Sequence, residues 1–248
     1  MKADAAAQQL LLDLQRLDTR TAQLEHRNRT LAQKQELADL NQRIQRLHDE
    51  HVAARVIAGD LERDQSRADA DVDQVRERAV KDQVLLDSGS IGDPKQLQNL
   101  QHELVSLARR QAELEDIELE IMERVEGAQA AVRQLAAQHE EALVARESLS
   151  AEVDALVAEI DAESQVVLVD RKELAARLPN DLLALYEKVR ADHNGVGAAH
   201  LHRGQCEGCR LQLPPNELER LRSIDPDEVV RCEECRRILV RTSESGLQ

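Results

Sequence analysis

Aromatic residues are almost absent from this sequence: among 248 residues there is one tyrosine, Tyr186, and there is no phenylalanine or tryptophan. Aromatic side chains supply much of the buried area in compact cores and line most small-molecule pockets. Their scarcity argues against a large globular enzyme domain, and the sequence shows no nucleophile–base set or phosphate-binding loop. We therefore expect a protein that is not an enzyme and has no small-molecule substrate.

Long apolar runs are also absent, since no stretch approaches the ~18 residues of a membrane-spanning helix. Asp4 and Asp13 bracket the short apolar run near the N-terminus, a pattern that excludes a signal peptide. We expect a cytoplasmic protein with no membrane partner, in a compartment where thiols stay reduced.

Positive charge is in deficit, with a formal net charge of −15. The excess of acidic side chains lies almost entirely in residues 1–194, because residues 195–248 carry 8 basic and 9 acidic side chains. A long acidic surface repels phosphate backbones. The first three quarters of the chain should therefore not bind nucleic acid indiscriminately.

The most regular pattern in the chain is an apolar repeat from Leu97 to Val167, with alternating spacings of three and four residues. Its members are Leu97, Leu100, Leu104, Leu107, Leu114, Ile121, Val125, Ala128, Val132, Leu135, Ala142, Leu149, Val153, Leu156, Ile160 and Val167. Such a narrow stripe stays on one side of a helix only if that side faces a partner helix in a supercoil. The repeat predicts a coiled-coil arm over residues 94–176.

A second arm of nearly equal length is expected over residues 4–86. Its apolar repeat slips once, between Leu31 and Leu37, so the helix should be distorted there or leave its partner. The first cluster of helix breakers follows at residues 88–94, where Asp93 should accept the N–H of Gln96 as an N-cap and Pro94 should begin the next helix. Equal arms around a short loop favour an antiparallel hairpin within one chain.

Polar residues on the second arm's apolar stripe predict the register of the hairpin. They are Gln111, Glu118, His139, Arg146 and Glu163. Because a buried charge without a partner is costly, folding about residue 90 should place Arg146 near Glu36 and Glu118 near Arg63. His139 should then lie opposite Asn41 as an ordinary histidine of the helix interface.

The four cysteines form two CxxC pairs, Cys206–Cys209 and Cys232–Cys235. A CxxC turn places two sulfurs on one side of a tight knuckle, and two knuckles on neighbouring hairpins complete a tetrahedral four-thiolate shell. Short β-prone segments flank both pairs, as in a zinc ribbon. We expect these cysteines to hold one structural Zn²⁺, because thiolate ligands in this geometry favour zinc or iron over hard cations.

A redox role is the alternative interpretation of CxxC, but that motif is normally single and begins a helix after a strand. A four-thiolate zinc also has no open position for water, so hydrolysis at this metal is not expected. The segment has few apolar residues, so metal binding should supply the folding energy of residues 195–248.

The predicted fold is mostly α: a long antiparallel coiled-coil helical hairpin followed by a small β-rich C4 zinc ribbon. The hairpin should span residues 1–178, with its tip near 87–93. Residues 179–248 should form the ribbon domain and, before it, a short helix from Leu182 to Arg190 that carries Tyr186 and is capped by Asn180 and Asp181.

Arginines gather around the two knuckles, and four of them are candidates for contact with a partner: Arg210, Arg231, Arg236 and Arg237. Arginine makes planar, bidentate contacts to phosphate. The same side chains would also balance the negative charge of a four-thiolate zinc centre, and both interpretations stay open. The ribbon has no aromatic residue on which a nucleic-acid base could stack.

Three segments resemble the bacterial C4-type zinc-ribbon proteins with an N-terminal coiled-coil hairpin. They are Asp93-Pro-Lys-Gln-Leu-Gln-Asn-Leu-Gln-His-Glu103, Leu183-Ala-Leu-Tyr186, and the cysteine block ending Cys232-Glu-Glu-Cys235-Arg-Arg-Ile-Leu. Glu233 and Arg236 depart from the family pattern, which often has proline after the third cysteine and glycine after the fourth. Positive φ is often needed after the last cysteine, so Arg236 should be strained or its turn altered.

The resemblance implies an elongated, non-enzymatic protein whose ribbon is a nucleic-acid-binding module. It also implies relatives linked to gene expression in flagellated bacteria, a role that the arginine and alanine bias of this sequence does not favour. The first hypothesis is an interaction scaffold whose ribbon docks protein or nucleic acid. The alternative is a transcription-machinery factor whose hairpin tip, with Asp87 and Asp93, modulates RNA polymerase. Self-association of two hairpins stays open.

Overall fold

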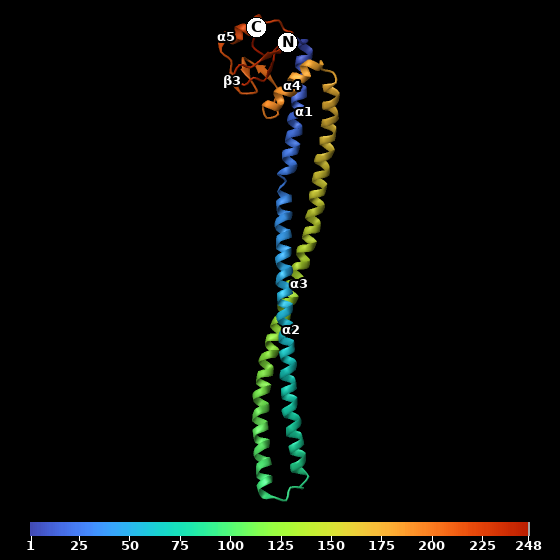
Figure 1. Cartoon of the computed structure of the whole chain (residues 1–248), viewed down its shortest axis with the longest axis vertical. Coiled ribbons are helices and arrows are strands. Elements are labelled where there is room, and N and C mark those ends of the chain that lie inside the picture. The colour runs from blue at the N-terminus through green and yellow to red at the C-terminus, as the bar shows by residue number, and fades with distance from the viewer. Residues whose placement is uncertain (248) are drawn as a thin grey trace. The chain divides into compact units, whose positions relative to one another are not determined.

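A computed structural model of the chain describes residues 1–247 and shows a long helical hairpin followed by a small strand-containing region (Figure 1). The hairpin consists of α1 (Ala5–Arg29), α2 (Ala32–Asp87) and α3 (Pro94–Ala175). The predicted fold class is confirmed. No helix in the described residues is long and apolar enough to cross a bilayer.

The first arm is two helices rather than one, which corrects the expectation of a single helix over 4–86. Helix α1 ends at Arg29, where the Thr30 N–H donates to the carbonyl of His26 (2.9 Å), and α2 begins at Ala32. The interruption lies just before the slip in the apolar repeat between Leu31 and Leu37. A break lets the chain re-phase its apolar stripe, which a continuous helix cannot do without over- or underwinding.

The tip of the hairpin is the loop 88–93 between α2 and α3 (Figure 1). Asp93 caps α3 as predicted, but its Oδ1 accepts the N–H of Lys95 (3.0 Å) rather than that of Gln96. Pro94 is the first helical residue, a position where its missing N–H has no helical acceptor in any case.

The apolar stripe of α3 is buried or half-buried where the repeat predicts it, except for its first member, Leu97, which is exposed. Its buried members are Leu100, Leu114, Val125, Ala142, Val153, Ile160 and Val167. On the facing arm the buried apolar residues include Leu14, Leu24, Leu47, Leu61, Ala68 and Val72. These are residues of the predicted helix–helix interface, so alternate three- and four-residue spacing identified it correctly.

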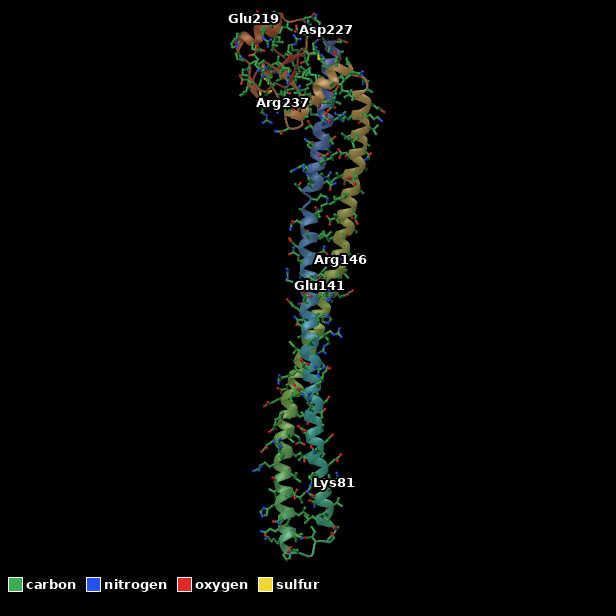
Figure 2. All side chains as sticks on the ribbon, in the orientation of Figure 1. Lys81, Glu141, Arg146, Glu219, Asp227 and Arg237 are labelled. Carbon is green, nitrogen blue, oxygen red and sulfur yellow. The ribbon has the colours of Figure 1, made fainter. Side chains whose placement is uncertain are left out.

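The predicted partners across the hairpin are wrong. Glu118 lies beside Asp69, and Arg63 instead forms an ion pair with Asp60 on its own helix. His139 lies against His48, with ring centroids 5.7 Å apart. Arg146 is exposed (Figure 2), and no carboxylate in the described part of the chain lies within ion-pair distance of it.

The register explains these errors. Near the tip, Arg78 pairs with Glu103 (3.0 Å), close to the expected alignment. Arg76 lies only two residues earlier but pairs with Glu115 (3.3 Å), which is much farther along α3 than the expected alignment allows. Long side chains reach diagonal neighbours, and the loop contributes unpaired residues, so symmetric folding about residue 90 does not fix the partners.

The C-terminal region combines a helix, α4 (Asn180–Asp192), with a mixed five-stranded sheet and a short helix, α5 (Pro215–Ser223). The strands are β1 (Ala198–His202), β2 (Gln205–Cys206), β3 (Leu211–Gln212), β4 (Val230–Arg231) and β5 (Ile238–Val240), in the spatial order β3-β2-β1-β5-β4. β1 and β5 pair in parallel, while the other pairs are antiparallel. Helix α5, which joins the two knuckles, was not predicted.

The chain divides into two compact units. One, the ribbon unit, consists of Met1–Lys34 and Ala151–Gln248; the other, the tip unit, consists of Gln35–Ser150. In the ribbon unit, α1 and α4 pack on the sheet through a core that includes Leu11, Leu14, Leu182, Tyr186 and Ile238. Residues before α1 also join the ribbon: the Ala3 N–H donates to Asp227 O (2.8 Å) and the Val229 N–H to Met1 O (3.0 Å).

Candidate metal centre

The four cysteine sulfurs converge between two knuckles. Each of the sulfurs lies within 4.8 Å of the other three. The Sγ atoms of Cys206 and Cys235 are 3.8 Å apart, and those of Cys209 and Cys232 are 3.9 Å apart. Four ligands at a Zn–S distance of ~2.3 Å in a tetrahedron are separated by about 3.8 Å. The donor set and its spacing therefore fit one zinc ion.

The two knuckles share the same backbone geometry. In the first, the Arg210 N–H donates to Cys206 O (2.7 Å); in the second, the Arg236 N–H donates to Cys232 O (2.9 Å). Both arginines have a left-handed backbone, with φ of 60° and 61°. The structure thus gives Arg236 the positive φ expected after the last cysteine, and adds Arg210 as its counterpart. An L-residue other than glycine is strained in this conformation.

Backbone N–H groups aim at the sulfurs and favour their thiolate form. The N–H groups of Cys209 and Gly208 lower the pKa of the Cys206 thiol, and those of Cys235 and Glu234 lower that of the Cys232 thiol. Burial is the larger effect and raises the pKa of both thiols. A cation between the sulfurs removes this conflict, because a coordinated thiol is deprotonated.

The first knuckle also requires a glycine for space. A Cβ at Gly208 would lie 2.9 Å from both Ala199 Cβ and Arg237 Cδ. Glu234 occupies the equivalent place in the second knuckle, so the two knuckles are alike in hydrogen bonding but not in packing.

The ribbon has a small hydrophobic core of its own beside the metal centre. It includes Cys206, Cys232, Leu201, Leu221 and Leu239. Leu221 comes from α5, which is further tied to the second knuckle by Arg220: its guanidinium pairs with Glu217 on α5 and with Glu233 (3.5 Å). Arg220 also lowers the pKa of the buried Glu217 carboxyl. A four-thiolate zinc in this position joins the two knuckles beside this core, so its role here is structural.

The arginines around the knuckles differ in what they contact. Arg237 donates to the carbonyl oxygens of Val196 (3.2 Å), Gly208 (3.2 Å) and His193 (3.4 Å). Arg241 donates to five carbonyl oxygens between Leu221 and Glu228, and its desolvation lowers its pKa. Both side chains hold the ribbon together.

The other three candidates for partner contact, Arg210, Arg231 and Arg236, are exposed. In the residues that the structure describes, no carboxylate lies within ion-pair distance of their guanidinium groups. The Arg231 Nε donates to the Arg236 carbonyl (2.7 Å), which brings these two residues together across the β4–β5 turn. Three positive charges at the knuckles are thus available to solvent.

A buried polar cluster, which the sequence did not reveal, ties the base of the hairpin to α4. Asp18 on α1 is buried and accepts bonds from the Tyr186 hydroxyl (2.6 Å), Arg171 Nε (2.6 Å) and Arg190 (2.9 Å). Glu187 pairs with both of these arginines. Burial and the Asp18 carboxylate raise the pKa of Tyr186, which stays a neutral donor. The signal available in the sequence was the single tyrosine itself.

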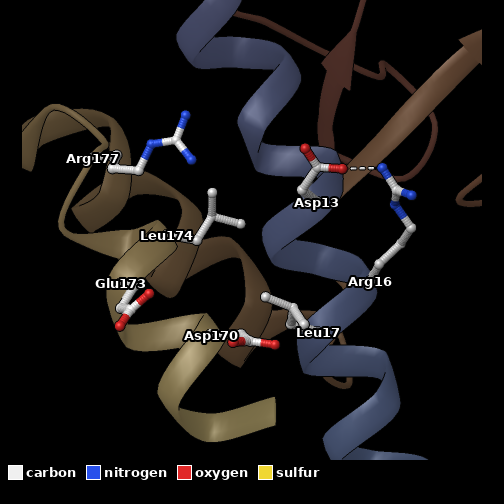
Figure 3. Close-up of a pocket in the computed structure, with 7 residues that line it drawn as sticks. All are labelled: Asp13, Arg16, Leu17, Asp170, Glu173, Leu174 and Arg177. Atoms are coloured by element: carbon white, nitrogen blue, oxygen red, sulfur yellow. Dashed lines mark hydrogen bonds and ion pairs between the residues drawn. The ribbon is translucent and has the colours of Figure 1, made fainter. Parts of the chain in front are cut away.

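An open hollow lies between α1 and the end of α3 (Figure 3). Leu17 and Leu174 form its apolar part, while Asp13 turns away to pair with Arg16 on its own helix. The remaining lining residues are Asp170, Glu173 and Arg177. Charged rims over a narrow leucine stripe are typical of a coiled-coil edge, so this hollow is part of the helix packing rather than a ligand site.

Two family descriptions match the chain. The "CT398-like coiled coil hairpin domain" matches residues 14–194, and the "C4-type zinc ribbon domain" matches residues 205–239. Neither description is that of an enzyme. The second match and the clustered sulfurs agree on one structural zinc.

Relatives and solved structures extend the match over nearly the whole chain. The uncharacterized protein Rv2229c of Mycobacterium tuberculosis is 40% identical over 97% of this chain and 98% of its own length. The uncharacterized protein ML1638 of Mycobacterium leprae is 29% identical over 88% of this chain and 93% of its own length. A solved Mycobacterium smegmatis structure is similar with a TM-score of 0.83 and 32% identity, over 97% of this chain and 100% of that one.

A more distant structure supports the fold alone: CT398 from Chlamydia trachomatis has a TM-score of 0.65 at 18% identity, covering 94% of this chain and 97% of that one. The hairpin match covers well over half of the sequence, and the ribbon match falls on the four cysteines. The chain therefore belongs to the family of CT398-like coiled-coil hairpin proteins that carry a C4-type zinc ribbon.

Proposed function

We propose that this protein is a non-enzymatic scaffold whose zinc ribbon docks a nucleic acid through the arginines of its two knuckles. The hairpin and ribbon families support a scaffold without catalytic machinery. Zinc would be held by Cys206, Cys209, Cys232 and Cys235 and would fix the knuckle geometry. That the partner is a nucleic acid is a proposal, and it rests on the positively charged arginines that the knuckles expose to solvent.

The observation that carries the proposal is the placement of Arg210 and Arg236. Each follows the second cysteine of a knuckle with a left-handed backbone, where glycine would be unstrained. Strained backbone positions are frequent at binding sites. The strain is tolerated there because it places a long functional side chain where it is needed. Here both strained side chains carry a guanidinium, are exposed, and are free of carboxylate partners within the described residues.

The chemistry of this surface favours phosphate contacts over base reading. Arginine binds phosphate with two parallel hydrogen bonds. The ribbon has no aromatic residue for stacking, so binding should depend on salt and discriminate weakly between sequences. The acidic surface of the helices would confine such binding to the ribbon.

The test is fluorescence anisotropy with labelled single-stranded RNA, single-stranded DNA and duplex DNA, comparing the zinc-loaded wild type with an Arg210→Gly/Arg236→Gly variant. Glycine removes the charge and relieves the backbone strain, so the ribbon should stay folded. The expected result is weaker binding and a salt slope reduced by about 2, one for each lost phosphate contact.

The matched control is Arg203→Gly. Arg203 is also an exposed arginine with positive φ (46°), but it lies in the β1–β2 turn rather than in a knuckle. This variant should bind as the wild type does. Equal binding by the wild type and the double variant, or equal losses in the double variant and the control, would contradict the proposal.

The alternative, in which Asp87 and Asp93 at the hairpin tip act on RNA polymerase, has less support. Asp93 is engaged as the cap of α3, and Asp87 accepts a hydrogen bond from Gln83 (2.9 Å). No observation at the tip favours this function over docking by the ribbon.

A further inference from the structure

We propose a second metal site on the outer side of the ribbon, formed by His200, His202 and Glu244, that takes a divalent transition-metal ion such as Zn²⁺ or Ni²⁺. One ligand atom from each of these residues lies within 4.8 Å of those of the other two. None of the three is a ligand of the four-cysteine centre. Two imidazoles and one carboxylate form a donor set that suits zinc, nickel and copper far better than magnesium or calcium.

The alternation of β1 places the two histidines together. His200 and His202 are two residues apart on one strand, so their side chains project from the same face. Their rings lie 5.6 Å apart, and Nδ1 of His202 is 3.5 Å from Glu244 Oε2. With bonds of ~2.0–2.2 Å to a metal, tetrahedral nitrogen and oxygen ligands lie about 3.4 Å apart, so the His202–Glu244 contact already has the spacing of a metal-bound pair.

The main chain that carries Glu244 is held in place by hydrogen bonds to the β1–β2 turn. The Arg203 N–H donates to Glu244 O (2.8 Å), and the Gly204 N–H donates to Ser245 O (2.9 Å). The segment 242–245 is closed by a bond from the Thr242 N–H to the buried Ser245 hydroxyl (2.8 Å). The C-terminal segment is thus fastened to the β1–β2 turn, and Glu244 faces His202 without a metal.

His200 has the hydrogen bond that metal-bound histidines usually have at their second ring nitrogen. Its Nε2 lies 2.7 Å from the Thr242 hydroxyl. This leaves Nδ1 for a metal, and a further carboxylate, Glu207, lies 3.7 Å from that nitrogen. His200 and Glu207 also line an open hollow of about 380 Å³, so this side of the His200 ring is reached by solvent.

The alternative is that these groups form only histidine–carboxylate ion pairs. Ion pairs alone would not require three ligand atoms to lie close together, nor the contact between His200 and Thr242. They also would not bind an added metal ion. A bound ion would join β1 to the segment 242–245 and would have open positions left for water or another ligand, as three-ligand sites do.

The experiment titrates the full chain, already holding one zinc, with Zn²⁺ and separately with Ni²⁺, using calorimetry and native mass spectrometry. The expected result is one further metal per chain, lost in His202→Asn and in Glu244→Gln, while the first zinc is retained. Thr242→Val should weaken the second site about 10- to 100-fold, the usual effect of removing such a support. Hydrogen exchange of residues 241–246 should slow on metal addition in the wild type only.

The control is His48→Ala/His139→Ala. These two rings are as close together (5.7 Å) as those of His200 and His202, but no third ligand joins them in the described residues. Loss of the second metal in this variant, or its persistence in Glu244→Gln and His202→Asn, would overturn the proposal. So would a wild type that binds no second metal. Because Glu244 is exposed, its substitution should leave the fold intact.

Discussion

The ribbon unit and the tip unit bury their side chains very differently. In the ribbon unit, Leu11, Leu14, Tyr186 and Ile238 are fully inaccessible to solvent, and a polar cluster is buried beside them. In the tip unit, the buried residues belong to one narrow stripe that includes three alanines, Ala58, Ala68 and Ala142, and valines and isoleucines elsewhere on its helices are exposed. The same chain therefore uses many layers of contact in one unit and a single helix–helix interface in the other.

This contrast indicates how stability is distributed. A three-dimensional core loses several contacts when one side chain is removed, whereas a two-helix interface loses contacts only with its immediate neighbours. We expect substitutions in the ribbon unit to have large effects and those in the tip unit to have small, local ones.

The largest effect is expected from loss of the metal. Cys232→Ser, or a strong chelator, should release zinc and abolish hydrogen-exchange protection over residues 198–240, because structural zinc contributes about 10 kcal/mol or more to folding. Helical protection in the tip unit should persist. Glu234→Ala, in the same knuckle, should retain zinc. A ribbon that stays protected without metal would show that its hydrophobic core suffices.

The next effect is expected at the buried polar cluster. Asp18→Ala should destabilise the ribbon unit by about 3–5 kcal/mol, since it leaves Arg171 and Arg190 without their shared carboxylate. Asp13→Ala is the control on the same helix, because Asp13 is only partly buried and, among the described residues, forms its ion pair with Arg16 alone; its effect should stay below about 1 kcal/mol. Denaturant unfolding of both variants measures the difference, and equal effects would contradict it.

A smaller effect, of opposite sign, is expected in the tip unit. Burial and the neighbouring Asp69 raise the pKa of Glu118, so its ionised form destabilises the hairpin. A raised carboxyl pKa means that stability is fully present below the unfolded-state pKa and is lost as pH rises through the folded-state value. Glu118→Gln should therefore raise the Tm near pH 7.

The gain in Glu118→Gln should shrink as the pH falls toward about 4, where the wild type is protonated too. Glu120→Gln, at an exposed position on the same helix, should change little. Thermal unfolding followed by circular dichroism at the two pH values separates these outcomes. A gain independent of pH would point to packing rather than charge.

The smallest effect is expected at the knuckle arginines. Arg236→Gly and Arg210→Gly should each stabilise the ribbon by at most about 1 kcal/mol, because relief of the left-handed backbone is partly offset by the greater entropy of unfolded glycine. Arg231→Gly in strand β4 should destabilise instead. Zinc-release kinetics in denaturant compare the three, and a destabilising Arg236→Gly would show that its side chain supports the fold.

The periodicity of apolar residues and the spacing of cysteines sufficed to predict the hairpin and the metal centre. The three- and four-residue repeat from Leu97 to Val167 depends only on helix geometry, and the CxxC pairs depend only on ligand chemistry. Both signals lie in consecutive residues. The predicted ion pairs failed because side-chain partners such as Glu118 and Asp69 depend on a register that the loop length does not fix.

Most of the remaining misses involve residues far apart in the chain. Asp18 and Tyr186 are each unremarkable in sequence, and their contact arises only when α4 folds back beside α1. Helix α5 was missed because its segment is short and highly charged, and because the two CxxC motifs on either side of it dominated the interpretation of this region. The pairing of Met1 and Ala3 with residues 227–229 has no sequence signature, because it is made by backbone atoms.

That last pairing has a consequence for synthesis on the ribosome. Residues 1–3 are translated before the backbone groups of residues 227–229 to which they bond, and α1 is translated before strand β5, on which it packs. The ribbon unit therefore cannot assemble before β5 has been translated. Until then Leu11 and Leu14 of α1 lack the residues that cover them, and a nascent chain stalled before residue 240 would leave them exposed.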